Sequence, residues 1–227
     1  MRMNDFILKN DVEAENQTKE KFKLYEVENS VKRILFLGNS ITLHERAPHI
    51  GWDRNCGMAA SCEENDYVHI VLRYLRERYG KISHCVVNVG AWEKNYWEEG
   101  QMEQWKAAKD FHADIVVFRL GENICKDHFE EYPLIGYLRS FVQYFIADAT
   151  KVVITDTFWE HGYICDCLKT VAQEINADFA IISDLGYENE NKAQGLFEHA
   201  GVAGHPGDLG MARIAERIIQ KICMQKE

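Results

Sequence analysis

Five short apolar runs alternate with helical patterns along the 227-residue chain. Each run ends in or near Gly, Asn, Asp or Ser, as is typical of buried strands that lead into turns. Between the runs, apolar residues recur at helical spacing, which predicts helices within 66–80, 129–149, 162–177 and 207–225. The runs, in order, are RILFLG, HCVVNVG, DIVVFRLG, KVVITDT and FAIISDL, which begin at positions 33, 84, 114, 151 and 179.

This alternation predicts the fold class. Strands that are apolar on both faces and are separated by helices form a parallel sheet covered on both sides. We therefore expect an α/β protein, a three-layer α/β/α sandwich with a five-stranded parallel sheet and a flavodoxin-like layout, that spans 31–227 as one domain. Residues 1–30 form a charged N-terminal extension or arm. A short strand at KLYEV (23–27) would either pack on its own domain or be lent to a partner subunit of a homo-oligomer.

Charge and composition exclude several classes of partner. A formal net charge of -10 repels nucleic acid and anionic membranes, so neither is an expected partner. The leading residues lack the apolar core of a signal peptide, and no apolar run reaches the roughly eighteen residues of a membrane span, so a cytoplasmic location is expected. Seven cysteines without paired CxxC spacing favour reduced thiols, and we expect neither a metal site nor another cofactor.

Polar residues collect at the ends of the predicted strands. In open parallel sheets the ligand crevice lies beyond the carboxyl ends of the strands. Ser40 follows the first run, Gly90 closes the second, Asn123 follows the third, and His205 precedes the last helix. A serine hydroxyl becomes a nucleophile when a base lies within hydrogen-bond reach, and acyl transfer requires donors for the developing oxyanion. The pattern therefore predicts one site at this edge.

Four motifs, GNSIT (38–42), Gly90, GEN (121–123) and HPGDLGM (205–211), resemble the four blocks of the SGNH hydrolases, also called the GDSL esterases. The resemblance runs from Arg33 to about Ile222 and implies the SGNH hydrolase fold. It also implies a nucleophile at Ser40 and a base at His205. The implied oxyanion hole consists of the Ser40 and Gly90 backbone N–H groups and the Asn123 side chain.

Two positions depart from the family pattern. Asn39 stands where the family often has Asp, in a role that braces the loop. Val202 stands where the family has the Asp that orients the histidine, so His205 needs another acceptor. We favour a backbone carbonyl, as in Ser-His dyads, with Glu198 as the next candidate. Asp208 could also reach the ring, but its position before the closing helix favours a capping role.

Aromatic and charged residues near the same edge are candidates for substrate binding. Trp52, Trp92 and Trp159 follow the first, second and fourth runs, where their faces could stack on a sugar or wall an acyl pocket. Packing of the long loops is the alternative interpretation. Arg54 and Glu93 are candidate polar contacts, with solvated surface charge as the alternative.

These features together predict a serine esterase that acts through an acyl-enzyme on a small-molecule ester. An acetylated saccharide is the favoured substrate. A thioesterase or a short-chain lipid esterase is the alternative among enzymes. A non-catalytic carbohydrate-binding protein is the alternative from another class, although Ser40, His205, Gly90 and Asn123 together argue against a decayed site.

Overall fold

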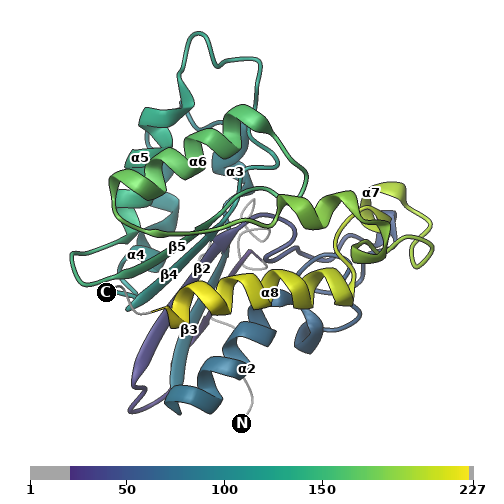
Figure 1. Ribbon diagram of the computed structural model, residues 1–227, viewed down its shortest axis with the longest axis horizontal. Coiled ribbons are helices and arrows are strands. Elements are labelled where there is room, and N and C mark those ends of the chain that lie inside the picture. Colours follow the sequence, from purple (N-terminus) through teal and green to yellow (C-terminus); the bar gives the residue numbers. More distant parts are fainter. Residues whose placement is uncertain (1–20, 225–227) are drawn as a thin grey trace, which may run out of the picture.

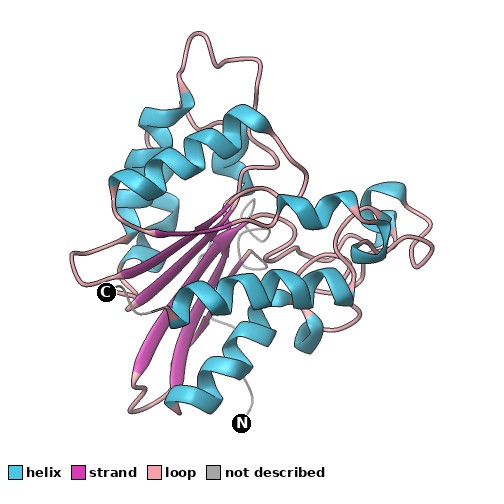
Figure 2. Ribbon diagram, in the orientation of Figure 1, coloured by secondary structure: helices cyan, strands magenta, loops and turns pink. Residues whose placement is uncertain are grey.

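The computed structural model describes residues 21–224, which form a six-stranded sheet with helices on both faces (Figure 1, Figure 2). The strand order is β1-β3-β2-β4-β5-β6. Strands β2 to β6 run parallel, and β1 pairs antiparallel with β3. The predicted α/β sandwich with five parallel strands is thus confirmed, and β1 adds a sixth strand at one edge. The bounds are β1 Phe22–Tyr25, β2 Lys32–Gly38, β3 Ile82–Asn88, β4 Ile115–Arg119, β5 Lys151–Thr155 and β6 Asp178–Ala180.

Helices cover each face of the sheet (Figure 1). On one face α2 (Tyr67–Tyr79) packs beside α8 (Asp208–Cys223). The other face carries α5 (Leu134–Phe145) and α6 (Gly162–Glu174), with the shorter α3 (Gly90–Lys94) and α4 (Lys106–Lys109). The remaining short elements are α7 Ala200–Ala203 and the 3-10 helices η1 Pro48–Ile50, η2 Glu63–Asn65, η3 Gln101–Trp105, η4 Ser183–Tyr187 and η5 Asn189–Asn191.

The central strand β2 shows why the apolar runs are continuous. Successive strand side chains point to opposite faces. Leu35 and Leu37 pack under α5 and α6, whereas Ile34 and Phe36 pack under α2 and α8, and all four are fully buried. A strand covered on both faces therefore needs apolar residues at every position, not at alternate ones.

Local signals set the ends of α2 as expected. The Asp66 side chain accepts a hydrogen bond from His69 N at the start of the helix, which satisfies one of the unpaired backbone donors. Gly80 follows the last turn with φ +92°, a conformation that a side chain would strain. The last helix differs, because Gly207 is its N-cap and no side chain of residues 21–224 caps it.

The end of β2 is the topological switch point of the sheet. The chain leaves β2 for β3 on one side and then returns to β4 on the other, so a crevice forms beyond β2. Gly38 ends the strand there. A Cβ on Gly38 would lie 2.0 Å from Thr42 Oγ1 and 2.3 Å from the Arg119 carbonyl oxygen. Only glycine lets the following loop, residues 39–42, fold this tightly over the sheet.

The segment that contains KLYEV packs on its own domain, which is one of the two placements expected for it. Lys23 donates to the Asn55 carbonyl oxygen at 2.6 Å and to Glu63 at 2.8 Å. Tyr25 stacks on His84 with ring centroids 4.4 Å apart. The rest of the predicted arm, residues 1–20, lies outside the described residues. Within 21–224, no helix is both long and apolar enough to cross a membrane.

Candidate active site

Ser40 and His205 meet at the crevice beyond β2. Ser40 lies on the loop after β2, and His205 lies between α7 and α8, 165 residues later. Ser40 Oγ and His205 Nε2 are 2.8 Å apart. This is the hydrogen-bond distance that a serine nucleophile and its general base require.

The backbone orients the imidazole. His205 Nδ1 lies 2.6 Å from the Gly201 carbonyl oxygen. Because a carbonyl oxygen can only accept, Nδ1 carries the proton and Nε2 is left to accept from Ser40. Val202, which stands where the SGNH pattern has Asp, is buried, and Glu198 is exposed. The arrangement is the carbonyl-held dyad favoured by the sequence analysis.

Asp208 holds a neighbouring loop, so the expectation that it caps the last helix was wrong. Its carboxylate accepts from Ser61 N at 2.8 Å, from Ser61 Oγ at 2.6 Å and from Asn65 Nδ2 at 3.0 Å. The cap position belongs to Gly207. Since Asp208 lies in the first helical turn, its negative charge still interacts favourably with the helix dipole.

The environment keeps His205 neutral. Burial lowers the pKa of His205 to about 4, because desolvation disfavours the imidazolium. The Gly201 carbonyl opposes this shift, and the Arg119 charge adds to it. The Trp159 ring covers the imidazole edge-on, with centroids 5.1 Å apart. His205 is therefore a free base at neutral pH.

The three expected oxyanion donors differ in their availability. Within residues 21–224, the Ser40 N–H has no hydrogen-bond acceptor. Asn123 is exposed, and its Nδ2 donates one hydrogen to Glu93 Oε2 at 2.7 Å, which leaves the other free. The Gly90 N–H instead donates to Asn88 Oδ1 at 2.8 Å. Gly90 would have to share that hydrogen to serve an oxyanion.

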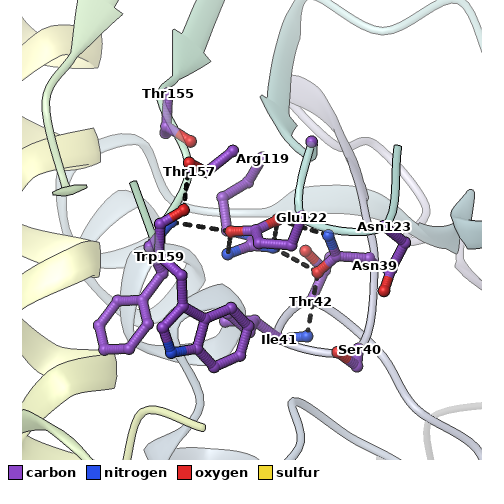
Figure 3. A network of polar contacts seen from close by, with 12 residues as sticks. Asn39, Ser40, Ile41, Thr42, Arg119, Glu122, Asn123, Thr155, Thr157 and Trp159 are labelled. Atoms are coloured by element: carbon purple, nitrogen blue, oxygen red, sulfur yellow. Dashed lines mark hydrogen bonds and ion pairs between the residues drawn. The ribbon is translucent and has the colours of Figure 1, made fainter. Parts of the chain in front are cut away.

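A buried ion pair lies beside the loop that carries Ser40 (Figure 3). Arg119 donates to both carboxylate oxygens of Glu122, at 2.9 and 2.8 Å, and also to Asn39 Oδ1. The Arg119 side chain is fully buried and that of Glu122 is 4% exposed. Glu122 also accepts from Phe158 N at 2.8 Å, which ties in the loop after β5. Arg119 lies inside an apolar run, where no pattern in the sequence marks it as part of the site.

Asn39 completes this network and explains the departure from Asp. Its Nδ2 donates to Glu122 Oε2 at 2.5 Å and to Glu93 Oε1 at 3.0 Å. An Asp at position 39 would place a third carboxylate against these two and would have no hydrogen to donate. The two glutamates therefore need a side-chain amide at position 39, because an amide can donate a hydrogen bond to each of them.

The structure corrects the expectation that Glu93 contacts the substrate. Its side chain lies in α3 and is fully buried. Besides Asn39 and Asn123, the Gly121 backbone N–H donates to Glu93 Oε1. Burial and the nearby Glu122 charge raise the pKa of Glu93 to about 6.

The aromatic candidates divide into buried and exposed side chains. Trp52 is fully buried. Trp92 is also buried and stacks on Phe141 with ring centroids 4.0 Å apart. The prediction that these two side chains contact the substrate was therefore wrong. Arg54 is exposed, lies over the Trp52 ring and borders a different cavity. Of the aromatic candidates, only Trp159, half-buried against His205, lies at the Ser40–His205 contact.

A cavity of about 490 Å³ opens at Ser40 and His205. Lys21, which lines it, pairs with Glu45 at 3.1 Å. Few of the lining side chains are apolar, and these are Ile50, Met58, Ala91 and Val202; the polar ones, besides Ser40 and His205, are Lys21, His44, Glu45, Asn88, Lys94, Asn95, Asn123 and His199. Within the described residues, no cluster of His, Cys, Asp and Glu could hold a metal ion.

Comparisons with known proteins bear on the fold. No protein-family model and no curated protein matches the chain. The psychrotrophic esterase EstA from Pseudoalteromonas sp., in a structure inhibited by monoethylphosphonate, is 14% identical with a TM-score of 0.53, over 84% of this chain and 96% of that one. A proposed GDSL-like lipase from Bacteroides ovatus ATCC 8483 is 15% identical with a TM-score of 0.55, over 86% and 99%. The acetyl xylan esterase AlAXEase is 17% identical with a TM-score of 0.52, over 83% and 98%. The chain thus has the fold of the GDSL-like esterases and lipases, as its four motifs predict.

Proposed function

We propose that this protein is a serine esterase of the SGNH type that hydrolyses a small acyl ester through an acyl-enzyme. The observation that carries the proposal is the relay from the Gly201 carbonyl oxygen through His205 to Ser40 Oγ, with contacts of 2.6 and 2.8 Å. This relay ends at the switch-point cavity, beside the free Ser40 N–H and the Asn123 amide. This set of groups serves acyl transfer.

Each step of the proposed reaction is carried out by named residues of the site. Ser40 Oγ attacks the ester carbonyl carbon while its proton moves to His205 Nε2. The Ser40 N–H, the Asn123 amide and a shared Gly90 N–H stabilise the oxyanion. When the bond between the acyl carbon and the alcohol oxygen breaks, the proton passes from Nε2 to that leaving oxygen. Water, activated in turn by His205, then hydrolyses the acyl-serine and restores both groups.

The cavity favours a small acyl group on a hydroxylated alcohol. Four of its lining side chains are apolar and can accommodate a short acyl group, whereas its amide, imidazole and charged groups can hydrogen-bond hydroxyl groups. The likeness to an acetyl xylan esterase supports the same choice. An acetylated saccharide is therefore the proposed substrate. In a panel, faster turnover of acyl thioesters or of longer nitrophenyl esters would instead favour the thioesterase or lipid esterase alternative.

Labelling tests the nucleophile. A fluorophosphonate probe should add once to the wild-type protein, because His205 activates Ser40 alone. Intact-mass spectrometry should show this adduct, and Ser40→Ala should abolish it together with deacetylation of acetylated sugars. An adduct at another residue, with Ser40 unmodified, would exclude the mechanism.

Removal of the side-chain donor tests the oxyanion hole. Asn123→Ala should lower kcat by about 10²- to 10³-fold while KM changes little, because the amide acts on charge that develops only in the transition state. Steady-state kinetics on an acetylated sugar measures both constants. A variant that loses only affinity would make Asn123 a substrate-positioning residue instead.

A further inference from the structure

We propose that Glu93 is a positioning residue that holds the Asn123 amide at the oxyanion site. This inference rests on the proposed function and deepens it, since it assigns a role to a residue that contacts no substrate. Asn123 is exposed and lies on a loop, and among the described residues its one side-chain hydrogen bond goes to Glu93 Oε2 at 2.7 Å. Without that contact, nothing in the structure fixes the direction of the amide.

Glu93, in α3, joins two loops at a single carboxylate. Its Oε2 binds Asn123, and its Oε1 accepts from Asn39 Nδ2 at 3.0 Å and from the Gly121 N–H. Asn39 directly precedes the nucleophile, and Gly121 begins the GEN motif. Gly121 has φ +131° and no room for a side chain, since a Cβ would lie 2.6 Å from Thr157 Cγ2, so this loop has little freedom. Glu93 thus fixes Asn123 relative to Ser40.

The contacts fit the ionised form of Glu93. All three partners are donors, and a carboxylate is an acceptor only. A protonated carboxyl would add a donor to a set of donors and would weaken one of the three bonds. The charged groups around Glu93 are Glu122, which opposes ionisation, and Arg119, whose positive charge is already shared by Glu122 and Asn39.

The different pKa values of Glu93 and His205 lead to an expected pH dependence of kcat. Burial and the Glu122 charge raise the pKa of Glu93 to about 6, whereas the pKa of His205 is lowered to about 4. As pH falls through about 6, Glu93 takes up a proton and releases Asn123, although His205 is still neutral. The acid limb of kcat should therefore lie near pH 6 in the wild-type protein.

Glu93→Gln tests the inference, because glutamine keeps the size of the side chain but replaces one acceptor oxygen with a donor. We expect kcat to fall by about 10- to 100-fold, which is no more than the fall expected for Asn123→Ala. KM should stay within about threefold of the wild-type value. The acid limb should move from about pH 6 to about pH 4, where His205 titrates. Glu63→Gln is the matched control, since Glu63 pairs with Lys23 outside the cavity, and it should leave both the rate and the limb unchanged.

A double-mutant cycle separates positioning from general loosening. If Glu93 acts through Asn123, Glu93→Gln should lower kcat by less than about threefold when introduced into Asn123→Ala. Additive losses, or a variant with wild-type rate and acid limb, would overturn the inference. The Asn123 side-chain amide resonance in NMR should also titrate near pH 6 in the wild-type protein and not in Glu93→Gln. An amide that does not titrate contradicts the inference, whereas a lack of Ser40-dependent turnover contradicts the proposed function.

Discussion

Replacing His205 with alanine should lower kcat on an acetylated sugar by about 10⁴-fold or more, with little change in KM, because loss of a general base removes activation of the nucleophile. Ser40 Oγ lies 2.8 Å from His205 Nε2, and among the described residues no other base contacts this hydroxyl. The low pKa of His205, about 4, means that the wild-type imidazole is already neutral at pH 7. Steady-state kinetics at pH 7 with thermal unfolding as a check on folding measures the effect.

Two carboxylates near His205 in the sequence provide the controls. Glu198→Gln and Asp208→Asn should each keep kcat within about tenfold of the wild type, because the Gly201 carbonyl oxygen and not a carboxylate orients the ring. Asp208→Asn alters only the contacts with Ser61 and Asn65. A collapse of turnover in a folded Glu198→Gln protein would make Glu198 the third catalytic member and would contradict the dyad.

Arg119→Met should destabilise the folded protein by about 3 to 5 kcal/mol, the usual cost of removing one partner from a buried ion pair. The Arg119 side chain is fully buried, and its loss leaves the Glu122 carboxylate without a cation and Asn39 Oδ1 without its donor. Urea unfolding followed by circular dichroism measures the free energy of unfolding. Methionine keeps an unbranched side chain, so the effect reports mainly the lost charge and hydrogen bonds.

An exposed pair provides the matched comparison. Arg139 binds Glu174 in the same two-pronged way, at 2.7 and 2.8 Å, but both side chains are more than a third exposed. Arg139→Met should therefore change the free energy of unfolding far less than Arg119→Met does, because solvent screens an exposed pair. Adding Glu122→Gln to Arg119→Met should recover part of the stability, because it removes the unpaired charge. Equal losses in the two single variants would show that burial of the Arg119 pair contributes nothing.

Much of the fold follows from local sequence. The runs that begin at Arg33 and Lys151 become β2 and β5 because strands covered on both faces must be apolar throughout. The Asp66 side chain caps the start of α2, and the backbone conformation of Gly80 ends the helix. The same reasoning failed for Asp208, since the choice between capping a helix and binding Ser61 depends on a loop 147 residues away.

The motifs of the candidate site were predictable from the sequence, but the buried residues that hold its loops in place were not. Ser40 stands out just after the first apolar run, and His205 stands out just before the last helix, each within a motif that resembles an SGNH block. The roles of Arg119 and Glu93 depend on partners such as Asn39, which lies 80 and 54 residues away from them, and no local pattern marks such pairs. Trp92 illustrates the same limit. Its place after a strand was correctly identified, but the direction in which its ring points is set by tertiary packing.

The antiparallel strand β1 has a consequence for self-association. An unpaired sheet edge presents a row of backbone donors and acceptors that a second copy of the chain can pair with, and short edge strands reduce that hazard. Here the two outermost strands, β1 and β6, have four and three residues, whereas the neighbour of β1, β3, has seven. By pairing Phe22–Tyr25 with β3, the leading segment converts the longest available edge into an interior strand. These few residues therefore protect the sheet against edge-to-edge aggregation.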